Sequence, residues 1–236
     1  LVASYLFYGW WDERFLFLII LSTALDFMCG LLLHNGRLTL QQRLAPSLHL
    51  IAGAFLFLVL DWGALSFHLQ APFVAVDADR LIVAGDLGWP AFGAVILFVV
   101  VANLLATIAE RLDEKRRRLA VVSASIVGNL SVLGFFKYFD FFVESAEAAI
   151  AALGFNPEPF RLNIILPVGI SFYTFQTLSY SIDIYRGKFK PTGDYLNFSL
   201  FVSYFPQLVA GPIERASNLL PRLESRRSVN WEDISA

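Results

Sequence analysis

The sequence predicts an all-α polytopic membrane protein, a multi-span helical bundle with a re-entrant segment. Of its 236 residues, 57% are hydrophobic and 16% are charged, whereas soluble domains contain about 25% charged residues. Apolar runs of roughly 20 residues, the length that crosses a bilayer, recur along the chain. We therefore expect a single membrane domain over 1–236, without a soluble domain, an internal repeat or a low-complexity linker.

The same composition excludes several other classes of protein. A disordered chain is poor in aromatic residues, and this chain has 23 Phe. A disulfide scaffold needs paired cysteines, and Cys29 is the single Cys. A net charge of −2 without a broad basic face argues against nucleic-acid binding. The partner that composition does imply is the lipid bilayer.

The apolar stretches predict the elements in chain order. The first residue is Leu1, the single Met is Met28, and 1–11 is too short to span. We interpret 1–11 as the tail of a truncated helix, and the chain as an internal piece of a larger protein. Complete spans are expected at 15–33, 47–69, 91–109, 119–136 and 164–182.

Residues 139–153 differ from the spans, because their apolar side chains recur at helical spacing while the acidic ones fall elsewhere. The apolar set is Phe139, Phe142, Val143, Ala146, Ile150 and Leu153, and the acidic set is Asp140, Glu144 and Glu147. This pattern predicts an amphipathic helix that lies on the outer face of the membrane.

The loops alternate in charge. Lys and Arg dominate 34–46, 110–118 and 183–195, whereas acids dominate 70–90 and 137–163, so the basic loops are expected on the cytoplasmic side. A full crossing by 196–213 would break this rhythm, because the following tail carries Arg215, Arg222, Arg226 and Arg227. Pro206, Gly211 and Pro212 instead favour a re-entrant element there. The basic block 111–118 is either a topology anchor or a site for anionic headgroups.

Several isolated polar residues allow two interpretations. Asp26 and Asp61 fall inside predicted spans, where a carboxylate must face protein or water; each is a helix–helix hydrogen-bonding group or part of a proton or substrate path. His34, His49 and His68 lack metal-ligand spacing and are expected near the interface rather than in catalysis. Cys29 is expected to be a small packing residue. No metal site is predicted.

The segment 164–185 is unusually polar for a membrane helix. Thr174, Thr177 and Ser181 share one face, and Tyr173, Gln176 and Tyr180 share the next. Lipid does not solvate so much polar surface, so this helix must face protein or a water-filled cavity. Ordinary interhelical hydrogen bonding and the wall of a tunnel for a polar substrate both remain open from the pattern.

Residues 166–223 read LPVGISFYTFQTLSYSIDIYRGKFKPTGDYLNFSLFVSYFPQLVAGPIERASNLLPRL. This run resembles the membrane-bound O-acyltransferase family, and within it the bacterial branch with alginate O-acetyltransferase and the teichoic-acid D-alanyl-transfer protein. Residues 1–27 and 134–142 resemble the same branch, whereas 45–110 add two spans that typical bacterial members lack. Together the matching segments cover a little under half of the chain.

The resemblance implies an O-acyltransferase of the bacterial inner membrane that moves an acyl group, expected to be acetyl, to a polysaccharide hydroxyl. It implies acetyl-CoA or an acyl-carrier thioester as donor, no bound cofactor, and a polysaccharide or a periplasmic acyl-relay protein as acceptor. The catalytic histidine of the family lies downstream of the matching run, so no catalytic residue is expected here. The residues expected to line or shape the substrate tunnel are Tyr173, Gln176, Pro206, Gln207, Gly211 and Pro212.

Two competing interpretations remain. Intramembrane carboxylates and a broken helix also occur in transporters and flippases, although an inverted repeat is not apparent in the sequence. The chain could also be an inactive structural homologue of the acyltransferases.

Overall fold

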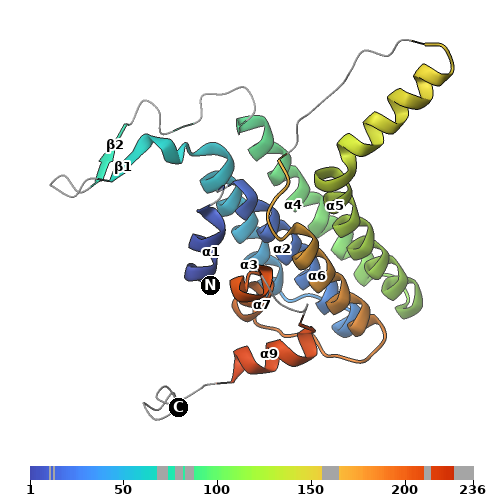
Figure 1. Ribbon diagram of the computed structural model, residues 1–236. Helices are drawn as coiled ribbons and strands as arrows, with labels where there is room; N and C mark the ends of the chain where they lie inside the picture. Colours follow the sequence, from blue (N-terminus) through green and yellow to red (C-terminus); the bar gives the residue numbers. More distant parts are fainter. Residues whose placement is uncertain are drawn as a thin grey trace, which may run out of the picture.

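The computed structural model describes residues 1–10, 12, 14–67, 74–77, 82, 88–155, 165–209 and 214–225. In this part the chain is an all-α membrane bundle, as predicted, with one short β-hairpin (Figure 1). The helices are α1 (Val2–Gly9), α2 (Arg14–Asn35), α3 (Leu40–Ala54), α4 (Gly88–Glu110), α5 (Glu114–Ala152), α6 (Ile170–Tyr185), α7 (Tyr195–Val202), α8 (Phe205–Val209) and α9 (Ala216–Glu224). The hairpin pairs β1 (Leu65–Phe67) with β2 (Val74–Val76), antiparallel.

Helix α2 is the centre of the bundle. It is an uninterrupted apolar helix of 22 residues, about 33 Å long and so long enough to cross the hydrocarbon core. It packs against α3, α5, α6 and α7, and Ile19, Phe27 and Leu33 have no exposed surface. Four stretches in the described part are long and apolar enough to span a membrane: Arg14–Asn35, Leu40–Val59, Gly88–Glu110 and Glu114–Ala152. The chain is therefore a multi-pass membrane protein.

The second predicted span, 47–69, is displaced in the structure. Its helix begins at Leu40, because Thr39 and Gln42 form a capping box that satisfies the first backbone N–H groups. Pro46 lies inside the helix and is tolerated there. The helix widens into a π-helical turn at Phe55–Val59 and then ends. Asp61 consequently lies beyond the helix, where its Oδ1 accepts a hydrogen bond from Gly63 N at 2.8 Å, so its predicted place inside a span is wrong.

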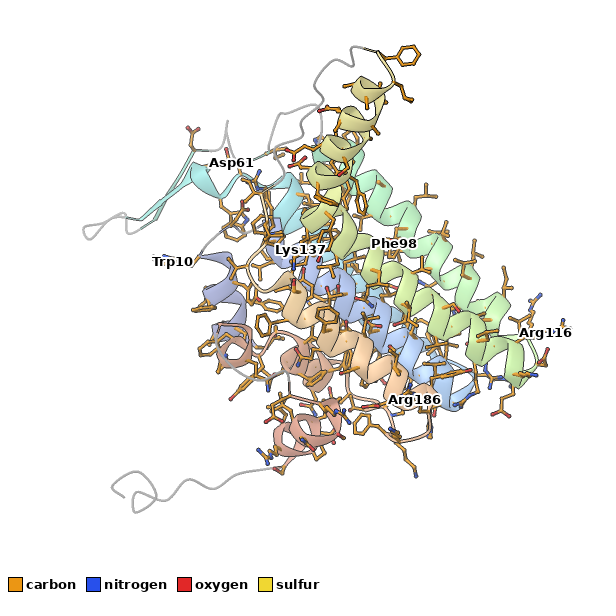
Figure 2. The ribbon with its side chains drawn as sticks, turned by 45° about the vertical axis from the view of Figure 1, so that its right-hand side comes forward. Trp10, Asp61, Phe98, Arg116, Lys137 and Arg186 are labelled. Atoms are coloured by element: carbon orange, nitrogen blue, oxygen red, sulfur yellow. The ribbon has the colours of Figure 1, made fainter. Side chains whose placement is uncertain are left out.

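The helices predicted at 119–136 and 139–153 are one continuous helix, α5, of 39 residues. Neither Pro nor Gly occurs between 135 and 152, so nothing in the sequence ends the helix between the two predicted elements. The part that packs on neighbouring helices ends near Leu133, its last buried residue. Beyond it, α5 changes direction and projects away from the bundle, drawn in yellow in Figures 1 and 2.

The polar segment predicted as a span at 164–182 forms a shorter helix. Residues 165–169 precede α6 as a loop, and Gly169 takes a left-handed conformation with φ 74° at the N-cap, a conformation that glycine adopts without strain. The 16 residues of α6 cover about 24 Å. Its polar face is turned into the bundle, where Tyr173, Gln176 and Ser181 are all buried.

The predicted re-entrant segment, 196–213, is described only as far as Val209, and its re-entry into the membrane stays a prediction. In its described part the chain forms α7, of 8 residues, and α8, of 5 residues, and neither is long enough to cross a bilayer. Helix α7 nevertheless reaches the interior, because its Tyr195 packs on Phe27 of α2 with ring centroids 5.0 Å apart. Gly211 and Pro212 lie outside the described residues.

The basic loops meet at one end of the bundle. Arg43 Nη2 lies 2.8 Å from Glu110 Oε1, and Arg118 donates to the carbonyls of Leu33 and Tyr185. These contacts join 34–46, 110–118 and the end of α6. Figure 2 shows Arg116 and Arg186 at this end, far from Asp61 and Trp10 at the other. The basic loops, which alternate with acidic loops along the sequence, thus gather at one end of the bundle.

Candidate functional site

Two of the six predicted tunnel residues are brought together by the fold. Gln176 Nε2 on α6 donates to the Phe201 carbonyl at the end of α7, at 2.9 Å, and lies 3.4 Å from Gln207 Oε1 on α8. Gln176 is buried and Gln207 half-buried, whereas Pro206 beside it is exposed. Gln176 therefore links the polar helix to both short helices of the broken segment.

The predicted residue Tyr173 lies deep in the same helix, with 1% of its surface exposed. Its hydroxyl has no hydrogen-bond partner among the described residues, and the same holds for the hydroxyls of Tyr8, Thr174 and Tyr180. Buried hydroxyls without partners are unfavourable, by about 1–3 kcal/mol each. Helix α6 thus carries buried hydroxyl groups that form no hydrogen bond with any described residue.

Asp26 is the centre of a second polar cluster, between α2, α5 and α6. Its carboxylate accepts hydrogen bonds from Ser125 Oγ at 2.5 Å, Asn129 Nδ2 at 2.7 Å and Ser181 Oγ at 2.9 Å. Thr177 Oγ1 lies 3.2 Å from Asn129 Oδ1 and extends the cluster. Asp26 has no exposed surface, and it lines neither the pocket between α3 and α7 nor the groove between α4 and α5 that are described below. This geometry matches a buried carboxylate that connects three helices by hydrogen bonds rather than part of a path for substrate.

His49 takes part in a third constellation, which sequence reasoning missed. Its Nδ1 lies 2.8 Å from Tyr195 Oη, and its Nε2 lies 3.3 Å from Tyr5 Oη. It is nine residues into α3, well inside the helix rather than at the interface, because α3 begins earlier than predicted. Residues 49 and 195 are 146 positions apart, so no local pattern in the sequence points to this contact.

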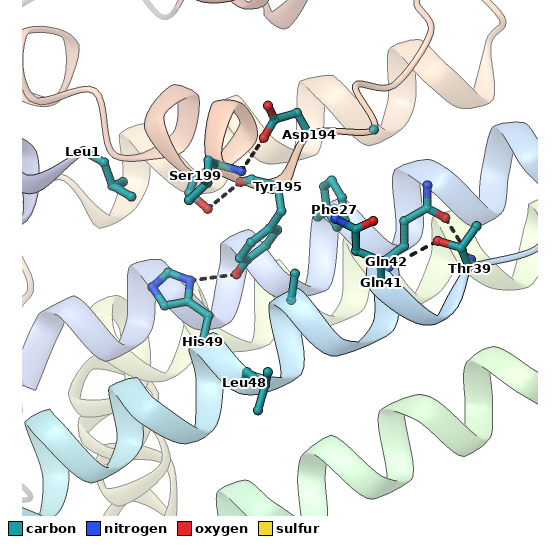
Figure 3. A pocket seen from close by; sticks show the side chains of 13 residues that line it. Leu1, Phe27, Thr39, Gln41, Gln42, Leu48, His49, Asp194, Tyr195 and Ser199 are labelled. Carbon is teal, nitrogen blue, oxygen red and sulfur yellow. Dashed lines mark hydrogen bonds between the residues drawn. The ribbon is translucent and has the colours of Figure 1, made fainter.

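The His49–Tyr195 pair borders a pocket of about 900 Å³ between α3 and the start of α7 (Figure 3). Asp194 and Thr39 also line it, and each already caps a helix. Both ring nitrogens of His49 are engaged by hydroxyls, so one donates and the other accepts if the ring is neutral. The pocket is roomy and combines polar with apolar side chains, but His49 is held by tyrosines rather than by a carboxylate that would activate it.

Within the described part, neither His34 nor Cys29 adds a catalytic constellation. His34 is exposed at the end of α2, His68 lies outside the described residues, and Cys29 is buried and free. Among the residues that the structure describes, no group of three or more His, Cys, Asp or Glu side chains could hold a metal ion.

Comparison with known proteins identifies bacterial O-acetyltransferases as relatives. The chain is 43% identical over 102 residues to a probable alginate O-acetylase of Pseudomonas syringae pv. tomato, and 45% identical over 102 residues to that of Pseudomonas aeruginosa, in each case 43% of this chain and 19% of the relative. It is 31% identical over 136 residues to a peptidoglycan O-acetyltransferase of Helicobacter pylori, 47% of this chain and 25% of the relative.

The matching part thus spans about a fifth to a quarter of the length of these relatives. No protein-family model and no solved structure matches the chain. The resemblance that the sequence predicts, to the membrane-bound O-acyltransferases of bacteria, is confirmed over part of the chain by these relatives.

Proposed function

We propose that this chain is part of a membrane-bound O-acyltransferase that transfers an acetyl group from a cytoplasmic thioester to a hydroxyl of a cell-surface polysaccharide. The observation that carries the proposal is the similarity, over two-fifths of the chain, to proteins named as alginate O-acetylases and a peptidoglycan O-acetyltransferase. The multi-pass bundle is the scaffold that such a reaction across a membrane needs.

The physical problem of this reaction supports a role for the polar helix. A thioester such as acetyl-CoA or an acylated carrier protein is too polar to cross hydrocarbon, so the acetyl group must be passed through the protein. Helix α6 carries buried hydroxyls without partners among the described residues, and Gln176 connects it to the broken segment through Gln207. We assign the wall of the acetyl path to this junction of α6, α7 and α8.

The orientation follows from the basic end of the bundle. Lys and Arg accumulate on cytoplasmic loops, so the end with Arg43, Arg118 and Arg186 is assigned to the cytoplasm and to the donor. The bacterial inner membrane is the membrane in which a cytoplasmic thioester and an outward-facing polysaccharide, or a periplasmic acyl-relay protein, lie on opposite sides.

The general base is assigned to a histidine outside this chain. The resemblance to the family supports a position downstream of 166–223, and neither His34, His49 nor His68 lies in a matching motif. The tyrosine partners of His49 support this assignment, because they already occupy both ring nitrogens. This part of the protein therefore shapes the path, and the histidine would activate the acceptor hydroxyl.

The test is Gln207→Ala in the full-length protein, expressed in a bacterial host that lacks its own O-acetyltransferase. Loss of the Gln176–Gln207 contact is expected to reduce transfer about tenfold by misplacing the path wall. The measurement is ester-linked acetate released by mild base from envelope polysaccharide, normalised to the folded protein in the membrane. The control is Asn35→Ala, which removes an exposed amide at the end of α2.

Two outcomes would contradict the proposal. Unchanged acetate with Gln207→Ala would remove the α6–α8 junction from the path. A wild-type protein that adds no ester-linked acetate, although folded and supplied with donor and acceptor, would exclude the transferase itself.

A further inference from the structure

An apolar groove runs along the outside of the bundle between α4 and α5, with α2 at its base. Its volume is about 330 Å³. Five alanines lie in its walls among larger apolar side chains such as Leu105 and Ile108, and they leave space between the two helices: Ala102, Ala106 and Ala109 on α4, and Ala120 and Ala124 on α5. Figures 1 and 2 show these helices side by side over the lower half of the bundle. The width left by alanines suits a slender apolar chain.

The groove extends along the helices toward the basic end. Phe98 lines it at one level of α4, and Leu112, in the turn between α4 and α5, lines it at the other. The helical rise puts about 18 Å between Phe98 and the end of α4 at Glu110. Figure 2 shows Phe98 along the helices and Arg116 at the basic end. An occupant would therefore lie parallel to the membrane-spanning helices, with one end at the membrane surface.

The mouth of the groove is positively charged. The α4–α5 turn carries Arg111, Lys115 and Arg116, all exposed. Arg116 pairs with Asp113, whereas Arg111 and Lys115 form no ion pair with any described residue. These two cations stand where an apolar groove reaches the membrane surface, and they contribute attraction to anionic headgroups.

We propose that this groove binds one acyl chain of an anionic glycerophospholipid, with the phosphate of its headgroup held by Arg111 and Lys115. Charge and depth together identify the occupant. The lining of the groove is mainly apolar, its polar side chains Asn103 and Ser47 are hydrogen-bonded to each other, and the cations stand at its surface end. The site is independent of acyl transfer, because none of its residues belongs to the α6–α8 junction.

The proposal is tested with the full-length protein, delipidated in mild detergent and then mixed with micelles containing phosphatidylglycerol or phosphatidylcholine of identical acyl chains. Phospholipid retained per protein after gel filtration is measured by mass spectrometry. We expect selective retention of phosphatidylglycerol, and Arg111→Gln with Lys115→Gln should weaken it roughly fivefold for each cation removed. The matched control, Arg186→Gln with Lys188→Gln, removes two exposed cations from another loop at the same end and should change little.

A second pair of variants tests the groove itself. Ala124→Phe places an aromatic ring in the groove and should abolish retention, because Ala124 is exposed and the ring can be accommodated without repacking the core. Ala94→Phe adds the same ring to an exposed position of α4 outside the groove and is the control. A photo-crosslinking residue at position 124 should form an adduct with phospholipid.

Any of three results would overturn the proposal. Equal retention of the two lipids would remove the role of the cations. Undiminished retention in the Ala124→Phe protein would place the lipid elsewhere. A crosslink from position 124 to another segment of the protein, or to a second copy, would show that protein covers the groove.

Discussion

Helices α2 and α4 are nearly equal in length and in apolar character, yet they occupy opposite environments. In the most apolar window of α2, 83% of the residues are buried inside the structure, whereas the figure for α4 is 17%. Exposed Leu97, Leu104 and Ile108 make up much of the α4 surface. Hydropathy therefore identifies a span but does not decide whether its side chains meet protein or lipid.

The difference between the two helices lies in their few polar or small residues. Asp26 on α2 accepts three hydrogen bonds from two other helices, and Gly30 allows Tyr180 of α6 to approach closely. On α4, Asn103 donates to one neighbouring side chain, Ser47, and Gly93 faces open space. Without a hydrophobic driving force between helices in lipid, polar and small residues determine which faces meet.

The largest effect is expected at Asp26. Asp26→Leu removes the acceptor of three buried hydrogen bonds and leaves the donors of Ser125, Asn129 and Ser181 without it. We expect a loss of about 3 kcal/mol in the free energy of unfolding, measured on the full-length protein in detergent. If Asp26→Leu lowered the free energy of unfolding no more than Asn103→Leu on α4 does, polar contacts would not explain why α2 is buried and α4 is exposed.

A smaller but sharper contrast comes from the two glycines. A Cβ at Gly30 would lie 2.6 Å from Tyr180 Oη, and Tyr180 cannot retreat because it is fully buried against Phe198, with ring centroids 4.6 Å apart. Gly30→Ala should cost about 1–3 kcal/mol, read as a lower melting temperature. The Cβ of Gly93→Ala would meet no atom within 4 Å, so this variant should stabilise α4 by up to about 1 kcal/mol. Equal changes in melting temperature for the two variants would contradict the difference in packing between Gly30 and Gly93.

The smallest effect is expected on α4. Asn103→Leu removes the hydrogen bond to Ser47 Oγ, at 3.1 Å, and should cost about 0.6 kcal/mol, the average for such bonds between membrane helices. Ser47→Ala removes the same bond from the other side. The two variants combined should cost no more than the larger of the two if the bond is their shared contribution, and a fully additive loss would mean that each residue acts through other contacts.

The sequence predicts α2 and α4 well, because each is a single apolar run with polar residues at both ends. It misplaces α3, since the apolar window hides the capping box of Thr39 and Gln42 and since Pro46 looks like a boundary. It places the start of α6 too early, because the turn made by Pro167 and Gly169 lies inside an apolar stretch. The bounds of a helix are thus predictable where its local signals agree. They are misplaced where a capping residue or a turn lies at odds with the hydropathy.

The candidate site is predictable only in part. Burial cost alone marks Asp26 as facing the bundle, but its partners Ser125 and Asn129 depend on which helices pack together. Family resemblance selects Gln176 and Gln207 without showing that they meet. The His49–Tyr195 contact depends on tertiary structure between distant segments, and no local periodicity encodes it.

The length of α5 has a consequence for folding. Beyond Leu133, α5 has no fully buried residue, and forming the first turn of an isolated helix is costly. Here the membrane-embedded half has already formed those turns, so each further residue needs only propagation. The projecting part is therefore helical through its covalent continuity with the span, and its order should diminish gradually toward Ala152 rather than be lost in one cooperative step.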